Sequence, residues 1–491
     1  MVVVIGGGCT GLGVAWDLIL RGVPVTVVEA RELGSGTSGR FHGLLHSGGR
    51  YAVTDPVSAK QCRQENEVLR RIAPSAVESV GGYFVSVDDG VESYMRDWIA
   101  GTQSAGIPVT EVSVETAIRR LPGLNPRVQR AFAVADAVLK GFELLDLLRV
   151  NGERRGVTIL TETRVTQVQT VNGQVSGISV RTKDGERRIP CDAVVNAAGP
   201  WAGQVAQLFG ERVQMELSSG LMLIYSNRMV PSVVNRLAPP GDGDIVVPHG
   251  RTVILGTTEV PQVDPEPPEP TRESAEYLQS LGQAMFPEMN RWRILRAFVG
   301  VRPLFEGNGV VPQSRVSRDF TVVDHGRQGG LQGAFSVMGG KWTTFRLMGE
   351  RTADVVVEYL HQSSPSISAH TVLEPDAPRE KHSASSTICE CERVSEAQLL
   401  DQMAEPFDNW RTRTWFAMGP CQGTMCAHRA VSLRMQYTDV EGGLDELTNL
   451  RRERERGVRP VAWGTNAREL ALTEALSCQT LAEGVAHDHL R

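Results

Sequence analysis

Two sets of residues in this chain of 491 residues have types and spacing suited to chemistry. The first is the loop at residues 6–11 (GGGCTG), whose Gly-x-Gly-x-x-Gly pattern is typical of dinucleotide sites. The second is four cysteines near the end of the chain, spaced as Cys389-x-Cys391 and Cys421-x4-Cys426. Thiolates in such a group can bind zinc or an iron–sulfur cluster. The first set predicts a cofactor that accepts a hydride, and the second predicts a centre that passes single electrons.

The elements expected around the glycine loop form a β-α-β unit. Apolar residues at 2–5 predict a buried parallel strand, residues 12–20 have helical apolar spacing, and residues 25–28 predict a second strand. In such a unit Gly6 permits the tight turn, Gly8 lets the backbone approach a pyrophosphate, and Gly11 lets the helix pack on the strand. Glu29 ends the second strand, where it can accept hydrogen bonds from a ribose hydroxyl. The order of these elements makes the otherwise weak glycine motif a specific prediction of a dinucleotide site.

Later segments favour FAD over NAD as the cofactor. Residues 34–51 are rich in small and hydroxyl side chains, so the backbone can lie against a large planar ligand. Residues 194–201 predict a buried strand that ends in a small-residue turn, and residues 335–341 repeat this pattern. Several returns of the chain to one ligand suit an extended FAD.

Composition excludes some classes of protein. The net charge of −6 gives no basic field and argues against nucleic acid as a partner. No apolar run approaches the roughly 18 residues that a membrane-spanning helix needs, and no secretory signal opens the chain. We therefore expect a cytoplasmic protein that meets a membrane only through partner subunits.

The length predicts two or three domains. We expect an oxidoreductase unit at 1–361, in which residues 1–85, 136–214 and 301–361 bind the flavin and residues 86–135 and 215–300 form a cap. Residues 362–386, rich in Ser, Pro and charge, predict a linker. A metal-binding domain at 387–440 and a helical tail at 441–491 follow. Within that tail, the charged run 451–456 (RRERER) is expected to be a solvated helix face, and the run 265–270 (PEPPEP) a surface loop.

Three segments make a resemblance to a known family specific. Residues 42–51 (HGLLHSGGRY), 300–304 (GVRPL) and 339–346 (GGKWTTFR) resemble signature segments of FAD-dependent glycerol-3-phosphate dehydrogenases. This family shares its fold with D-amino-acid and sarcosine oxidases. The resemblance therefore implies an α/β fold: a Rossmann-like FAD-binding domain of the D-amino-acid-oxidase type, an interleaved mixed-sheet substrate domain and a small C-terminal iron–sulfur domain. With the four cysteines and residues 457–464 (GVRPVAWG), the similarity extends over essentially the whole chain and narrows to catalytic subunits of anaerobic three-subunit enzymes.

The resemblance also implies an activity and a set of site residues. The activity is oxidation of sn-glycerol 3-phosphate to dihydroxyacetone phosphate, with hydride transfer to FAD. The implied catalytic residues are Arg302, Lys341 and His46, and the implied substrate-binding residues are Tyr51, Arg251, Arg302, Arg318 and Lys341. The implied FAD-binding residues are Gly6, Gly8, Gly11, Glu29, Thr37, Ser38, His42, Leu44, Ser47, Val165, Ala198, Gly199, Trp201, Gly340, Lys341, Trp342 and Thr343.

The chemistry of a phosphorylated polyol agrees with these implied residues. The substrate is a dianion, for which Arg supplies a rigid fork of donors and Lys a point charge. In one respect the chain departs from the family, because related enzymes have a Lys-Gly step where this chain has Ser219-Gly220. The phosphate pocket therefore has one cation fewer than the family pattern.

The cysteine spacing favours a 2Fe-2S cluster over zinc, because structural zinc sites more often use Cys-x2-Cys pairs. The segment also resembles the 2Fe-2S domain of the bacterioferritin-associated-ferredoxin type. In this domain Cys421 is expected at a helix N-terminus, where backbone amides stabilise its thiolate. The family implies further flavin and iron–sulfur subunits that pass electrons to membrane quinone; zinc and a vestigial site remain alternatives.

Two other functions are compatible with these features. One is an FAD-dependent dehydrogenase acting on an amine, an opine or a 2-hydroxy acid, because the same fold serves those substrates. The other is a non-catalytic electron-transfer subunit whose flavin only relays electrons. The setting of Arg302 and Lys341 favours catalysis.

Overall fold

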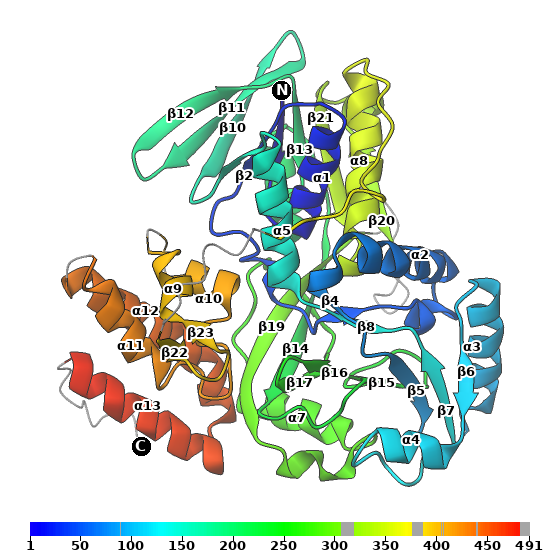
Figure 1. The fold of residues 1–491 in the computed structure, drawn as a ribbon. Helices are drawn as coiled ribbons and strands as arrows, with labels where there is room; N and C mark the ends of the chain where they lie inside the picture. Colours follow the sequence, from blue (N-terminus) through cyan, green and yellow to red (C-terminus); the bar gives the residue numbers. More distant parts are fainter. Residues whose placement is uncertain are drawn as a thin grey trace.

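A six-stranded sheet forms the centre of the layered domain built from strands within residues 1–361 (Figure 1). The computed structural model describes residues 1–88, 90–305, 319–375, 386–403, 405, 407–437 and 440–481. The sheet has the order β20-β21-β13-β1-β2-β9, and all its neighbouring strands are parallel except β20 and β21. Its strands are β1 (Val2–Ile5), β2 (Val25–Val28), β9 (Thr158–Leu160), β13 (Ala193–Asn196), β20 (Phe320–Asp324) and β21 (Ala334–Gly339).

Opposite faces of β1 pack on two different layers. Val2 and Val4 belong to the core shared with α1 (Cys9–Leu20), α5 (Gly141–Arg154) and α8 (Phe345–Tyr359). Val3 and Ile5 pack on the antiparallel sheet of β10 (Arg164–Val171), β11 (Gln174–Thr182) and β12 (Gly185–Pro190). A strand buried on both faces needs a continuous apolar sequence, which is why residues 2–5 are all β-branched.

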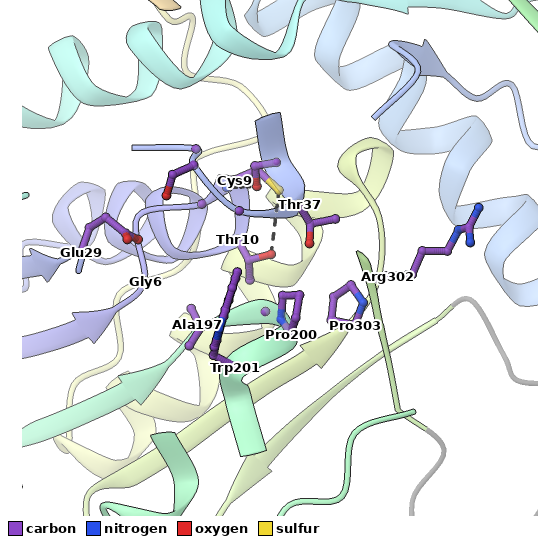
Figure 2. Close-up of a pocket in the computed structure, with 18 of the residues that line it drawn as sticks. Gly6, Cys9, Thr10, Glu29, Thr37, Ala197, Pro200, Trp201, Arg302 and Pro303 are labelled. Atoms are coloured by element: carbon purple, nitrogen blue, oxygen red, sulfur yellow. Dashed lines mark hydrogen bonds between the residues drawn. The ribbon is translucent and has the colours of Figure 1, made fainter. Parts of the chain in front are cut away.

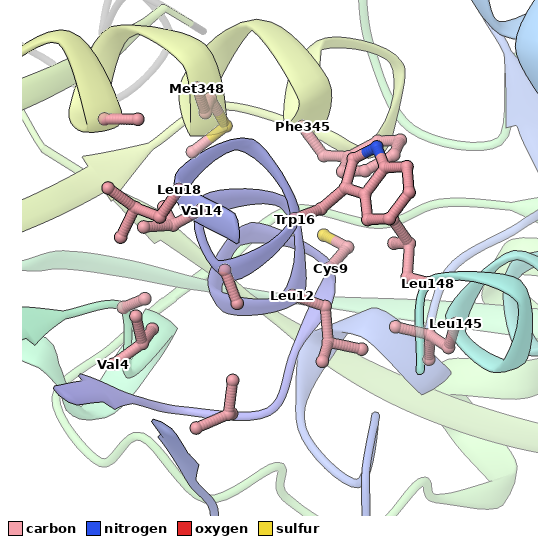
Figure 3. Packing of buried hydrophobic residues seen from close by; sticks show 14 of the residues in the cluster. Val4, Cys9, Leu12, Val14, Trp16, Leu18, Leu145, Leu148, Phe345 and Met348 are labelled. Atoms are coloured by element: carbon pink, nitrogen blue, oxygen red, sulfur yellow. The ribbon is translucent and has the colours of Figure 1, made fainter. Parts of the chain in front are cut away.

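Helix α1 is the most enclosed of the helices that cover this sheet. Figure 3 shows its side chains Leu12 and Trp16 pointing towards α5, while Val14 and Leu18 point towards Met348 of α8. A Cβ placed on Gly349 would stand 2.5 Å from the carbonyl oxygen of Gly13, so two glycines permit the close contact of α1 and α8. The predicted β-α-β unit is confirmed, with the helix beginning at Cys9.

A second, nine-stranded mixed sheet lies beside the first (Figure 1). Its order is β18-β14-β17-β16-β15-β5-β7-β6, and β19 pairs with β14 along its other edge. The strands are β5 (Gly82–Ser86), β6 (Thr110–Val112), β7 (Arg130–Val134), β14 (Glu216–Tyr225), β15 (Val233–Arg236), β16 (Ile245–His249), β17 (Thr252–Gly256), β18 (Val260–Gln262) and β19 (Ile294–Leu304). Strands from two distant parts of the chain thus share one sheet, as the predicted interleaved substrate domain requires.

Shorter elements complete this part of the chain. The small sheet β3-β8-β4 is formed by Leu44–Leu45, Ala137–Leu139 and Val77–Glu78. The remaining helices here are α2 (Pro56–Ile72), α3 (Glu92–Ser104), α4 (Val114–Arg120), α6 (Ala202–Gln207) and α7 (Arg272–Gly282).

The C-terminal segment has a hydrophobic core of its own, centred on Trp410 and Phe416. Its elements are β22 (Thr387–Cys389), β23 (Val394–Ser395), α9 (Glu396–Leu400), α10 (Phe407–Thr414), α11 (Cys426–Arg434), α12 (Val440–Val458) and α13 (Thr465–Leu481). Helix α12 contacts β19, and α10 contacts α5. No helix in the described part of the chain is long and apolar enough to cross a membrane.

Two expectations about the surface are corrected. The charged run 451–456 is not wholly solvated: Arg454 is only 6% exposed and donates from Nη1 to Gln422 Oε1 at 3.3 Å, and α12 packs against β19. The expected linker is partly packed as well, since Leu373 is buried and its amide donates to the carbonyl of Ile72. Residues 376–385 of that segment lie outside the described residues. The run 265–270 lies in a loop, as expected.

Candidate active site

A cavity of about 470 Å³ opens at the carboxyl ends of β1, β2 and β13. Ligands of open α/β sheets bind at this edge, where the turns after parallel strands meet. Most of the sequence-predicted site residues line the cavity: Gly6, Gly8, Glu29, Thr37, Ser38, His42, Leu44, His46, Tyr51, Val165, Ala198, Gly199, Trp201, Arg302, Gly340, Lys341, Trp342 and Thr343. The fold therefore brings together residues from five distant parts of the chain.

The glycine turn makes one end of the cavity a cradle without side chains. Gly6 has φ +115°, and a Cβ there would stand 2.5 Å from the carbonyl oxygen of Ala197. A Cβ on Gly8, the residue that caps α1, would lie 2.9 Å from Ser38 Oγ. The open backbone at the start of α1 offers amides to an anionic group, as the pyrophosphate of a dinucleotide requires. Gly11 does not line the cavity; a Cβ there would meet the Gly6 carbonyl oxygen at 1.9 Å, so its role is packing.

Glu29 is held rigidly on the wall beside this turn. Its carboxylate accepts hydrogen bonds from the amide of Gly7 at 2.7 Å and from the amide of Arg31 at 2.9 Å. Figure 2 shows Gly6 and Glu29 at one end of the cavity and Arg302 at the other, with Pro200 and Pro303 between them. A long cavity with a phosphate cradle and a fixed carboxylate at one end fits an extended dinucleotide such as FAD.

The opposite end of the cavity gathers polar and cationic side chains. The Arg302 guanidinium on β19 donates to Ser218 Oγ at 3.3 Å, to the carbonyl of Thr258 at 3.0 Å, and to Thr257 Oγ1. Lys341, which follows β21, donates from Nζ to Ser58 Oγ at 3.1 Å, and its Nζ lies 4.7 Å from the centroid of the Tyr51 ring.

His46 completes this end of the cavity. Its ring centroid is 5.2 Å from that of Tyr51, and its backbone amide donates to Thr343 Oγ1 at 3.2 Å. Burial, together with the neighbouring His42, Arg50 and Lys341, holds the pKa of His46 well below its usual range. Burial also lowers the pKa of His42 to about 3, with Arg50 and Arg302 contributing. Both imidazoles are therefore neutral near pH 7, the state in which a histidine can accept a proton.

Besides Gly11, two predicted residues in the described part of the chain, Ser47 and Arg251, do not line the cavity. Ser47 is buried behind it, where its backbone amide donates to Asp136 Oδ1 at 2.7 Å. Arg251 lies in the tight turn between β16 and β17, which projects towards the C-terminal segment, so it lines a second cavity next to Glu392. The assignment of Arg251 to the substrate pocket is therefore wrong. Arg318 lies outside the described residues.

Sequence reasoning missed other residues that line the cavity. Examples are Thr10, Arg31, Phe41, Thr163, Gln204 and Pro303. Thr10, Arg31, Phe41 and Pro303 neighbour predicted residues in sequence, so a wider window around each motif would have included them. Thr163 follows β9 and Gln204 lies in α6, and neither has a local sequence signal of its own.

The four C-terminal cysteines converge in space. Hydrogen bonds join Cys389 to Cys426, Cys426 to Cys421, and Cys421 to Cys391, and none of the four forms a disulfide. The hydrogen bonds from Cys426 lower the pKa of Cys389 to about 6 and that of Cys421 to about 5. The expectation for the helix start is wrong, because α11 begins at Cys426 and not at Cys421.

The donor chemistry of this cluster suits a soft metal, because all four groups are thiols and two have thiolate character near pH 7. However, no three Cys, His, Asp or Glu side chains among the described residues are already arranged as a metal site. The thiols are instead linked one to the next in the order Cys389, Cys426, Cys421 and Cys391.

Fold and cavity together define a flavin-dependent oxidoreductase. A glycine turn and an acidic strand end suit the dinucleotide part of FAD, and the remote end of the cavity is polar. The model of the FAD dependent oxidoreductase family matches residues 1–354, and the chain belongs to this family. It is therefore an enzyme, and FAD is its cofactor.

Relatives of known name match nearly the whole chain. An anaerobic glycerol-3-phosphate dehydrogenase subunit from Haloferax volcanii is 37% identical over 98% of this chain and 90% of its own length. The corresponding subunit from Escherichia coli K12, with the same enzyme name, is 34% identical over 96% of this chain and 95% of its own length. Among solved structures, glycerol-3-phosphate dehydrogenase from Bacillus halodurans, complexed with FAD, matches with a TM-score of 0.59 and 19% identity over 98% of this chain and 88% of its own. This structural match confirms the expected fold class.

Proposed function

We propose that this chain is the catalytic subunit of a quinone-linked glycerol-3-phosphate dehydrogenase, which oxidises sn-glycerol 3-phosphate to dihydroxyacetone phosphate. The observation that carries the proposal is a pair of cations on the cavity wall: Arg302 lies at the end opposite Glu29 (Figure 2), and Lys341 lies against Tyr51. A phosphorylated alcohol is a dianion, and cationic side chains are the groups that bind it best. The names of the relatives from Haloferax volcanii and Escherichia coli support the same substrate.

The residues of the two ends have separate tasks in this proposal. The glycine turn and Glu29 hold FAD, which when bound supplies the acceptor for the hydride that leaves C2 of the substrate. Arg302 and Lys341 bind the phosphate and stabilise the alkoxide that develops as the hydroxyl proton leaves. Tyr51 forms the wall against which Lys341 is held.

We propose that His46 accepts the proton of the substrate hydroxyl. Its imidazole is neutral because burial and nearby positive groups lower its pKa, so a ring nitrogen can accept the hydroxyl proton. The same positive groups disfavour the protonated imidazolium, so His46 then releases the proton to solvent or to another proton acceptor. The product is a ketone that carries the unchanged phosphate ester.

We further propose that Cys389, Cys391, Cys421 and Cys426 hold a 2Fe-2S cluster, which carries electrons from the flavin to partner subunits at the membrane. The convergence of four free thiols supports a soft-metal ligand set. Zinc would use the same ligands without passing electrons, so the metal content of the purified protein distinguishes the two.

Anaerobic titration of the FAD-loaded protein tests the function directly. Glycerol 3-phosphate should bleach the flavin absorption, whereas a 2-hydroxy acid and an amine should not. Bleaching by either of those compounds alone would replace the proposal with a dehydrogenase of another substrate class. A flavin that no substrate reduces would indicate a protein that only relays electrons.

A further inference from the structure

A second cavity, of about 390 Å³, lies between the flavin-binding part of the chain and the C-terminal segment. One wall is the loop at residues 32–41, and the opposite wall contains Glu392, Trp415, Met418 and Gln422. Four residues of that loop, Gly34, Ser35, Ser38 and Phe41, also line the first cavity. The two cavities therefore share a wall one loop thick, and a ligand in the second cavity would not overlap the FAD site.

Cationic side chains outnumber carboxylates around this second cavity. Its three carboxylates are Glu32, Glu392 and Glu453, and its six cations are Arg40, Lys140, Arg251, Arg296, Arg411 and Arg454. Several of the charges are already paired. Glu453 lies 3.3 Å from Arg296, 2.6 Å from Arg411 and 3.5 Å from Arg454, while Lys140 lies 3.1 Å from Glu143.

Arg40 and Arg251 are the two cations of the cavity that take part in none of these pairs. Neither forms an ion pair or a side-chain hydrogen bond within the described ranges, although the charge of Arg251 acts on Glu392, whose pKa is raised by burial to about 7. Burial lowers the pKa of Arg40, and nearby arginines lower it further, while Glu453, which other arginines share, acts in the opposite direction. A guanidinium retained in such a place, where burial and like charges both oppose it, indicates an anion that compensates it.

The rest of the lining is aromatic. Phe41, Phe142, His249 and Trp415 line the cavity, and the Trp415 ring centroid lies 5.3 Å from that of His249 and 6.2 Å from that of Phe142. Half-buried aromatic rings beside these two guanidiniums suit a ligand with both a flat ring and a phosphate. The cavity has more than three quarters of the volume of the FAD cavity, and a mononucleotide is about half a dinucleotide, so such a ligand fits.

We propose that this second cavity binds a nucleoside monophosphate, with its phosphate on Arg40 and Arg251 and its base against Trp415. The site would be complete only when the C-terminal segment is docked, because Trp415 belongs to that segment and Arg40 and Arg251 do not. A bound nucleotide should therefore stabilise the contact between the C-terminal segment and the flavin-binding part of the chain.

Calorimetric titration of the full-length, FAD-saturated protein with adenosine 5′-monophosphate tests the proposal. One molecule should bind per chain without release of flavin. Arg40→Ala and Arg251→Ala should each weaken binding about tenfold to a hundredfold, the loss expected for one charge-assisted contact. Arg181→Ala is the matched control, because Arg181 is 64% exposed on the β10–β12 sheet and should leave affinity unchanged.

Three outcomes would overturn the assignment. These are no binding to the FAD-saturated protein, affinity unaltered in both variants, and binding that occurs only as flavin is displaced. Inorganic phosphate that binds as tightly as the nucleotide would overturn the role of Trp415 and hence the nucleotide class. If Arg40→Ala does not fold, Arg251→Ala still decides the matter, because Arg251 lies in an exposed turn.

Discussion

Replacing Arg302 by alanine is the sharpest test of the proposed reaction. The guanidinium lies at the end of the cavity remote from the glycine turn, so its loss should not affect the groups that hold FAD. Its protein contacts, to Ser218 and Thr258, hold the fork in place on β19. We therefore expect Arg302→Ala to fold, to bind flavin and to lose most of its turnover.

The size of the loss follows from the number of contacts made to the substrate. The two terminal nitrogens of Arg302 already donate to Ser218, Ser219, Thr257 and Thr258, so we count a single charge-assisted contact with phosphate, which contributes about 1.5–3 kcal/mol. This corresponds to a fall in kcat/KM of about 10- to 10²-fold. Arg302→Lys keeps the charge but not the fork, and should recover only part of this loss.

The assay is steady-state oxidation of glycerol 3-phosphate with a dye acceptor, with flavin content measured from the visible spectrum. Arg130→Ala is the matched control, because Arg130 is an exposed residue of the same nine-stranded sheet and pairs with Glu111. If Arg302→Ala kept the kcat/KM of the control while retaining its flavin, the substrate pocket would have been wrongly located. A variant that lost its flavin would instead contradict the separation of the two ends of the cavity.

Three further substitutions test other parts of the proposal. Cys421→Ser should remove bound iron but leave flavin reduction by substrate intact. The control is Cys191→Ser, which replaces a buried thiol of the flavin-binding part and should keep the iron. Iron retained in Cys421→Ser would exclude Cys421 as a ligand. Gly11→Ala should abolish flavin binding, because its Cβ would stand 1.9 Å from a carbonyl oxygen of the glycine turn. Gly241→Ala, whose Cβ would meet no atom closer than 3.8 Å, should bind flavin normally. Equal flavin content in the two proteins would refute this role of Gly11. Surrounding arginines hold the pKa of Glu453 well below its usual range, so its stabilisation is present above the unfolded-state pKa of about 4.3 and is lost as the pH falls below it. Glu453→Gln should therefore lower the melting temperature near neutral pH and flatten its fall in acid, and an unchanged acid profile would show that the carboxylate carries no such coupling.

Local sequence patterns predicted the parts of the site that depend on neighbours in the chain. The β-α-β unit is encoded by a β-branched run, a glycine turn and an apolar helix, all within residues 2–28. Glu29, Arg302 and Lys341 stand directly in such patterns, and the fold brings all three to one cavity.

Errors arose where position depends on distant contacts. Arg251 was assigned through the resemblance to the family, but the direction of its turn is set by how β16 and β17 join the large sheet. Arg454 lies in a run whose charges alternate, and such a run gives no sign that Arg454 will be buried or that Glu453 will pair with Arg296 of β19. Ser47 was assigned to FAD through the same resemblance, yet its backbone amide donates to the buried Asp136.

Strand β19 explains how the substrate end and the C-terminal segment are joined. Side chains alternate along a strand, so Arg296, Phe298, Gly300 and Arg302 lie on one face. The first two line the second cavity and the last lines the first cavity. Gly300 lies between them, where a Cβ would stand 2.2 Å from the carbonyl oxygen of Arg40.

The loop that separates the two cavities therefore crosses β19 at its glycine, and the hydrogen bond from Thr37 Oγ1 to the Val301 carbonyl fixes that crossing. A side chain at position 300 would push the loop away from the strand and alter both cavities together. Because Arg296 also pairs with Glu453 of α12, the C-terminal segment contacts the same strand that carries Arg302. The arginine that we propose for substrate binding thus shares a strand face with Arg296, which pairs with the segment that holds the four cysteines.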